Sequence, residues 1–199
     1  MDTARTLHHA LTQVQGYIYP NELELQWNLL IVLYPFITGL VAGAFILASL
    51  VKVFNVRAVR DTYRLALLTA LSFLLVAPLP LNLHLGRPER AFEIFFTPNT
   101  TSAMAMFGFV YIWYLMAILL IELWLEYRRQ IVAWANATPG ILGIFYKALT
   151  LGVRDIPARA AALDEKIAGI ISVIGIPSAF LLHGYVGFIF GSIKANPWW

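Results

Sequence analysis

Four long apolar stretches constrain this chain more than any other feature of its sequence. They cover about residues 27–54, 64–83, 101–124 and 166–193. The hydrocarbon core of a bilayer is roughly 30 Å thick, and a helix needs about 20 apolar residues to cross it. The sequence therefore predicts an all-α integral membrane protein in which four transmembrane helices form a bundle. The composition agrees, because 60% of the residues are hydrophobic and only 13% are charged.

The basic residues are divided unequally between the two sides of the predicted spans. Ten of the 14 lysines and arginines lie near the connections after the first and third spans: Lys52, Arg57, Arg60, Arg64, Arg128, Arg129, Lys147, Arg154, Arg159 and Lys166. Basic connections stay on the cytoplasmic side of a membrane. We therefore expect both termini, and the loop between the second and third spans, to lie outside. The net charge of +3 indicates orientation and not a nucleic-acid partner.

The spans divide the chain into two regions. Residues 1–26 contain one arginine and no apolar run, so we expect an outer interfacial segment and not a cleavable signal peptide. Residues 27–199 hold the four-helix transmembrane bundle. Within it, about residues 130–165 are interrupted by Pro139 and Pro157. The pieces between these prolines are too short to span and too apolar to be solvated, which predicts a cytoplasmic interfacial loop.

Several residues within the spans have two possible interpretations. Pro78 and Pro80 either break the second helix and form the wall of a site, or simply stop it at the interface. The spacing of Gly39 and Gly43 favours close helix packing. Glu122 is about nineteen residues into the third helix, which places it near the inner interface. It either extends towards the cytoplasm or begins a proton path.

Two histidines, His84 and His183, fall in the outer half of the predicted bundle. A buried imidazole needs partners for two ring nitrogens, and a quinone oxygen, a haem iron or a neighbouring side chain could provide one. We expect no haem, because His84 lies too close to the surface to face His183 across the bundle. The absence of cysteine excludes thiolate-ligated iron–sulfur clusters in this chain. Tyr185 is two positions after His183, so on a regular helix the two side chains point about 200° apart.

Quinol oxidation releases two electrons and two protons, so a quinone site needs hydrogen-bonding groups and a route to water. Tyr185, His183, Asn28 and the Arg87–Glu89 pair have suitable chemistry near the outer surface. Composition and spacing alone do not single out a quinone.

Four segments of the chain carry specific motifs: HLGRPERAFEIFF (84–96), TPNTTSAMAMFG (97–108), HGYVGFIFGSIKANPWW (183–199) and LYPFITGLVAG (33–43). They resemble the NrfD/polysulfide-reductase membrane-subunit family. In that family the first segment usually reads Asp-Leu-Gly-Arg-Pro-x-Arg, and a Ser-x-Met segment follows. Together these segments indicate the amino-terminal half of such a protein. The family has about four further helices, so the chain resembles a truncated or split member.

The resemblance implies a quinone site near the outer face of the first four-helix bundle, holding menaquinone or ubiquinone. Tyr185 matches a fourth-helix tyrosine of that site, and His183, two positions earlier in the chain, is a further predicted quinone-binding residue. Trp27 and Asn28 correspond approximately to residues at the start of the first helix. His84 stands where the family commonly has aspartate, which puts a carboxylate proton role at this position in doubt. These five residues are the predicted quinone-binding residues.

The resemblance also implies a place in a larger assembly. Family members are quinone-reactive anchors beside a ferredoxin-like iron–sulfur subunit, often with a further periplasmic catalytic or cytochrome subunit. The implied location is the bacterial cytoplasmic membrane. Gly86 and Pro88 restrict the outer loop, which could hold charges rigidly against a partner. The predicted interface residues are Arg87, Glu89, Arg90 and Trp198. A purely structural anchor, without its own quinone site, is the alternative.

Overall fold

The structure is a computed structural model that describes Thr6 and residues 29–84, 88–97 and 103–191. All regular structure in these ranges is helical. The first half contains α2 (Leu29–Lys52), the 3-10 helix η1 (Arg57–Thr62), α3 (Tyr63–Val76) and α4 (Pro78–His84). The second half contains η2 (Pro88–Phe95), α5 (Ala103–Ile112), the π-helix η3 (Trp113–Leu120), α6 (Ile121–Ala137), α7 (Gly140–Leu149) and α8 (Ala158–Gly191).

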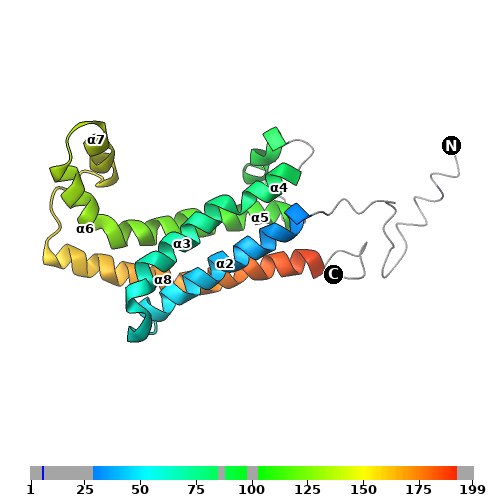
Figure 1. The fold of residues 1–199 in the computed structure, drawn as a ribbon, viewed down its shortest axis with the longest axis horizontal. Coiled ribbons are helices and arrows are strands. Elements are labelled where there is room, and N and C mark those ends of the chain that lie inside the picture. Colours follow the sequence, from blue (N-terminus) through cyan, green and yellow to red (C-terminus); the bar gives the residue numbers. More distant parts are fainter. Residues whose placement is uncertain (1–5, 7–28, 85–87, 98–102, 192–199) are drawn as a thin grey trace.

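Four helical segments of the described chain are long and apolar enough to cross a membrane. They are Leu29–Lys52, Arg57–His84, Gly108–Ala137 and Ala158–Ile189. Figure 1 shows them side by side, with the α2–α3 turn at one end of the bundle and η2 at the other. The predicted all-helical class with four apolar spans is therefore confirmed. The orientation, with both termini outside, stays a prediction.

Two of the helices extend further than the apolar stretches predict. The third span was expected to end near Trp124, but α6 continues to Ala137. The fourth was expected to begin near Lys166, but α8 begins at Ala158. Arg128 Nη1 donates to Asp164 Oδ1 over 2.6 Å between these extensions. Hydropathy falls at charged residues, whereas a helix can continue through them when they find partners.

The extended ends of α6 and α8 project beyond the turn that joins α2 to α3 (Figure 1). α7 packs against α6 at this projecting end. Its apolar residues Ile141, Ile144 and Phe145 are exposed. The interfacial position of the segment within residues 130–165 stays a prediction.

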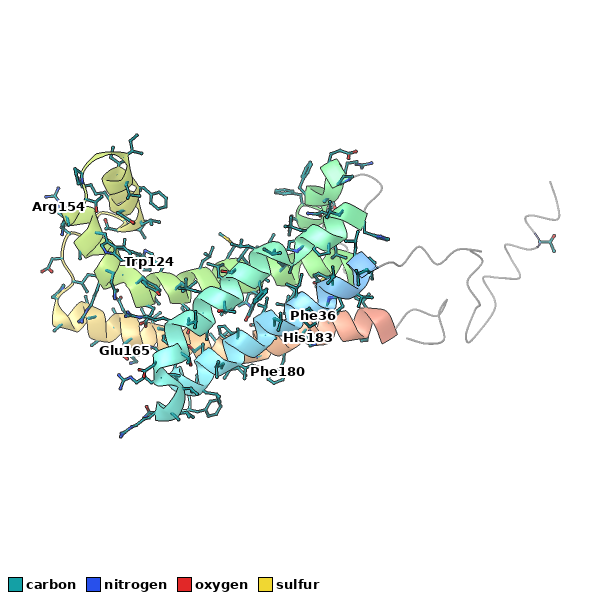
Figure 2. The ribbon with its side chains drawn as sticks, viewed as in Figure 1. Phe36, Trp124, Arg154, Glu165, Phe180 and His183 are labelled. Carbon is teal, nitrogen blue, oxygen red and sulfur yellow. The ribbon has the colours of Figure 1, made fainter. Side chains whose placement is uncertain are left out.

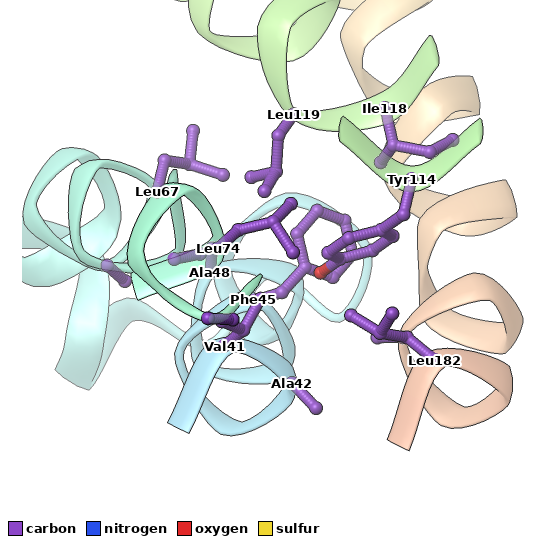
Figure 3. Packing of buried hydrophobic residues seen from close by; sticks show 14 of the residues in the cluster. Val41, Ala42, Phe45, Ala48, Leu67, Leu74, Tyr114, Ile118, Leu119 and Leu182 are labelled. Atoms are coloured by element: carbon purple, nitrogen blue, oxygen red, sulfur yellow. The ribbon is translucent and has the colours of Figure 1, made fainter. Parts of the chain in front are cut away.

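The core lies between α2, α3, η3 and α8, whose buried side chains point towards one another (Figure 3). The rings of Phe45 and Tyr114 meet edge to face, with centroids 5.6 Å apart. Phe45 also lies directly against Gly175 of α8, where an added Cβ would be 2.2 Å from the Phe45 Cζ atom. The close approach of α2 and α8 therefore requires a residue without a side chain at position 175.

Candidate functional site

Three tyrosines from three helices form a cluster at one end of the bundle. Tyr34 comes from α2, Tyr111 from α5 and Tyr185 from α8. Tyr34 and Tyr111 belong to the same buried core cluster, and Tyr185 packs against that cluster. Tyr34 and Tyr111 are almost fully buried, and Tyr185 is half-buried. We call these residues the tyrosine cluster, and the end of the bundle that holds them the tyrosine end.

The cluster binds the second span through the backbone carbonyl of Leu74. Pro78 leaves this carbonyl without its usual helical donor. Pro78 has no N–H, so the carbonyl of Leu74 cannot receive the usual bond from four residues ahead. The Tyr111 hydroxyl donates to this carbonyl instead, over 2.5 Å. Ala77 keeps helical dihedral angles, so the chain passes from α3 into α4 without a break. The predicted broken helix is therefore wrong, and the carbonyl that Pro78 leaves without its helical donor lies against a polar side chain.

His183 lies beside α2 in the same half of the molecule. Figure 2 shows it on α8, far along the helix from Glu165. Its side chain is exposed, and its Cε1 atom would be only 3.1 Å from a Cβ added at Gly39. A Cβ added at Gly43 would meet nothing within 4 Å. The two glycines therefore do not act as a pair, because only Gly39 makes room for a side chain of another helix.

The two predicted site residues of α8 contact the first span at different levels. His183 faces Gly39, whereas Tyr185 packs against the core cluster that includes Tyr34. α8 is helical through both positions, which is consistent with the large angle expected between the two side chains. His84 is the half-buried last residue of α4, and α4 packs against α2. The predicted residues Trp27 and Asn28 lie outside the described residues.

The outer loop places two of the predicted interface residues at the surface. Glu89 and Arg90 are exposed on η2. Arg90 donates from Nε and Nη2 to the two carboxylate oxygens of Glu93, each over 2.8 Å. These hydrogen bonds raise the pKa of the Arg90 guanidinium and lower the pKa of the Glu93 carboxyl. The Arg90 side chain is thus held by its own turn. Arg87 and Trp198 lie outside the described residues.

The ring of Phe95 connects this turn to the cluster. Phe95 is the last residue of η2, and its ring centroid is 6.2 Å from that of Tyr111. The outer turn and the tyrosine cluster are therefore parts of one packed region. A molecule bound to the turn would lie close to the cluster.

A second polar site lies in the other half of the bundle, around Glu122. Its side chain is fully buried. Its Oε1 atom accepts hydrogen bonds from the Tyr63 hydroxyl at 3.0 Å and the Ser172 hydroxyl at 2.7 Å. The Oε2 atom is also buried and has no hydrogen-bond partner among the described residues. The interpretation that Glu122 extends towards the cytoplasm is wrong, because its carboxyl group points into the bundle.

Sequence reasoning missed Tyr34, Tyr111 and the partners of Glu122. A hydroxyl on an apolar span is a weak signal, since most tyrosines in membrane helices mark the interface. The pairing of Tyr111 with the Leu74 carbonyl joins residues 37 positions apart in the chain. The sequence does contain one signal for this pair, because Pro78 lies on one span and Tyr111 lies on the next. This signal predicts a contact only when the relative depth of the two helices is known.

The comparisons with known proteins agree with one another. Residues 20–199 match the sequence profile of the family described as polysulphide reductase, NrfD. A selenate reductase subunit from Mesobacillus selenatarsenatis is 32% identical over 182 residues, which are 87% of this chain and 42% of that protein. A putative dimethyl sulfoxide reductase membrane subunit from Halobacterium salinarum is 29% identical over 173 residues, which are 83% of this chain and 35% of that protein. The chain thus spans less than half the length of either relative. No solved structure is significantly similar to it.

Proposed function

This chain belongs to the NrfD polysulphide reductase family, and we propose that it is a quinone-binding membrane subunit of an oxidoreductase complex. In this role it passes electrons between membrane quinone and an iron–sulfur partner subunit. The observation that carries the proposal is the tyrosine cluster, which joins three helices in the half of the bundle that also holds the exposed imidazole of His183.

The side chains at the tyrosine end fit a flat apolar ring that carries two oxygen atoms. A phenol hydroxyl donates one hydrogen bond and accepts two, so it can bind a ligand as well as a neighbouring residue. The Tyr185 ring is half-buried, which allows contact with a ligand that enters from the lipid. The exposed large apolar side chains Phe36 and Phe180 belong to the two helices that carry Tyr34 and His183. An apolar molecule could therefore reach this region within the membrane.

A bound quinone supplies two-electron, two-proton chemistry. In our proposal Tyr185 donates a hydrogen bond that orients one ring oxygen. In the same proposal the exposed imidazole of His183, which points away from Tyr185 on α8, exchanges a proton at a ring nitrogen. Gly39 leaves room for the imidazole, because a Cβ at this position would come within 3.1 Å of the His183 Cε1 atom.

The surrounding complex is also part of the proposal. The two relatives are described as subunits of selenate reductase and of a putative dimethyl sulfoxide reductase. By analogy, we propose a ferredoxin-like partner that docks on the outer loop through Glu89 and Arg90, with a further catalytic or cytochrome subunit beyond it. The basic residues at the other end of the bundle support a periplasmic location for this loop in a bacterial cytoplasmic membrane.

Substitution of Tyr185 by phenylalanine tests the proposal. The change removes one hydroxyl and keeps the ring, so we expect quinol-dependent turnover to fall tenfold or more at normal assembly. A tenfold loss corresponds to about 1.4 kcal/mol of transition-state stabilisation. Tyr146→Phe is the matched control, because Tyr146 lies on α7, a helix remote from the cluster.

Unchanged turnover in Tyr185→Phe would support the purely structural anchor instead. A second measurement concerns the ligand itself. The purified complex should retain extractable quinone, and the Tyr185→Phe complex should retain less of it than the Tyr146→Phe complex. A haem absorption band stoichiometric with this chain would contradict the expected absence of haem.

A further inference from the structure

Two adjoining cavities form a charged cleft at the end of the bundle opposite the tyrosine cluster. Their volumes are about 530 Å³ and 570 Å³. The first lies under the η1 turn, and the second lies between α6 and the start of α8. Five residues line both: Lys52, Arg60, Arg64, Glu126 and Glu165. We call the two cavities together the basic cleft.

The acidic groups of the basic cleft are largely occupied by ion pairs. Glu126 lies 2.8 Å from Arg64 Nε and 3.9 Å from Lys52 Nζ. Lys52 Nζ is also 3.6 Å from Glu165. Asp164 is held by Arg128, which itself does not line the cleft. These contacts neutralise three carboxylates of the cleft.

Three arginines of the basic cleft remain without a carboxylate partner among the described residues. Arg57 and Arg60 project from η1, and Arg129 projects from α6. All three are exposed. Asp61 is the only lining carboxylate of the described residues outside the ion pairs above. The cleft therefore presents guanidinium groups from two separate elements to an incoming anion.

The position of the cleft determines which anion can reach it. α2 ends and α3 begins at the η1 turn, whereas α6 and α8 extend past this turn (Figure 1). The cleft lies in the corner of this step, at the level where the apolar span of α2 ends at Lys52. The adjoining Phe54 and Val56 are exposed, with 62% and 37% of their surfaces accessible. Apolar side chains beside cationic ones are typical of the boundary between lipid acyl chains and headgroups.

We propose that the basic cleft binds the headgroup phosphate of an anionic phospholipid, of the phosphatidylglycerol class. Arg57 and Arg60 approach the phosphate from η1, and Arg129 approaches it from α6. Guanidinium groups bind phosphate oxygens in bidentate geometry, and clefts of this kind between membrane helices are suited to lipid headgroups. The acyl chains extend past Phe54 into the bilayer. This site is independent of the quinone site, which lies at the other end of the bundle.

Asn55 gives the η1 turn the shape that the site needs. Its φ of 53° lies in the left-handed region, which asparagine tolerates better than most residues. This conformation reverses the chain between α2 and η1. The reversal brings Arg57 and Arg60 over the end of α2, next to Lys52, in the first cavity.

Native mass spectrometry of the purified complex tests the proposal. After incubation with equal amounts of phosphatidylglycerol and phosphatidylcholine, the wild-type complex should retain phosphatidylglycerol preferentially. The double variant Arg57→Gln/Arg60→Gln should retain about tenfold less. Arg129→Gln, on a different helix, should also lower retention and covers the case in which the double variant does not assemble. Lys147→Gln/Arg154→Gln removes the same charge from exposed positions outside the cleft, and should change retention by less than about twofold.

Three outcomes would overturn the proposal. Equal retention of the two lipids would show that the cleft has no preference for an anionic headgroup. An equal loss in the control variant would show only general electrostatic attraction. Displacement of the lipid by excess inorganic phosphate would show that a free anion, and not a lipid, is the ligand. Quinol-dependent turnover should be unaffected in Arg129→Gln. A failure of the lipid-binding proposal can therefore be distinguished from a failure of the proposed quinone function.

Discussion

Some single polar residues are buried in the bundle and hydrogen-bond to other helices. Glu122 is the clearest case, because its carboxyl group is fully buried within a membrane-spanning helix. Burying such a group is unfavourable unless hydrogen bonds compensate for the lost water. Two hydroxyl groups, from α3 and α8, supply these bonds to one carboxylate oxygen. The carboxyl thereby joins three helices at a single point.

Replacement of Glu122 should distinguish its hydrogen bonds from its packing. Glu122→Gln keeps a carbonyl oxygen that can accept from Tyr63 and Ser172, whereas Glu122→Leu leaves both hydroxyls without this partner. We expect the leucine variant to lose about 1–3 kcal/mol of unfolding free energy, and the glutamine variant to lose less. Thermal or detergent-induced unfolding measures the difference. If the leucine variant is as stable as the wild type, the two hydroxyl contacts do not contribute to stability.

At the scale of elements, a hydrogen bond that a helix loses is replaced by a side chain of a neighbouring helix. Pro78 removes one hydrogen bond from the second span, and Tyr111 of α5 replaces it. The π-helix η3 directly follows α5 and brings Tyr114 into the core. Trp113, on the same π-helix, donates to Ser178 of α8 over 3.3 Å. A sequence shows where a helix loses a hydrogen bond, but it does not show which residue of another helix replaces that bond.

A double-mutant cycle should detect this compensation. Tyr111→Phe removes the hydroxyl that serves the Leu74 carbonyl and should cost about 1–3 kcal/mol of unfolding free energy. Pro78→Ala supplies a backbone N–H to the same carbonyl. In the Pro78→Ala background, Tyr111→Phe should therefore cost clearly less, and the coupling energy should differ from zero. Additive effects of the two substitutions would contradict the proposed exchange of donors.

The approach of α2 to α8 gives a second prediction at this scale. Gly175→Ala places a Cβ against the buried ring of Phe45, which Tyr114 and Ile118 enclose. Overpacking of this kind typically costs about 1–3 kcal/mol, so the thermal midpoint should fall. Gly169→Ala is the matched control on the same helix, because its Cβ would meet nothing within 4 Å. Equal stability of the two variants would show that α8 can shift without cost.

The whole molecule is a bundle whose two ends have different chemistry. The tyrosine end presents phenol and imidazole groups beside the outer turn, and the opposite end presents the basic cleft. The proposed quinone and lipid sites are thus separated along the bundle axis. This polarity matters only if the bundle has one orientation in the membrane.

Cysteine labelling tests that orientation in a chain that has no cysteine of its own. Thr97 is exposed at the tyrosine end, and Ala158 is exposed at the start of α8. An impermeant thiol reagent added to intact cells should label Thr97→Cys and not Ala158→Cys. Both should react after the membrane is permeabilised. Labelling of Ala158→Cys from outside would invert the topology and place the tyrosine end on the wrong side for a periplasmic partner.

The sequence by itself determined the fold class, the number of spans, the family and the distribution of basic residues. The class and the number of spans depend on the length and composition of continuous segments, which the membrane limits to helices, and the family follows from short local motifs. Only the tertiary structure decided where α6 and α8 end, which groups hold Glu122, and that Gly39 faces His183 while Gly43 faces open space. Each of these depends on the depth and rotation of one helix against another. Apolar pattern leaves those two quantities open, because lipid and protein neighbours favour the same residues.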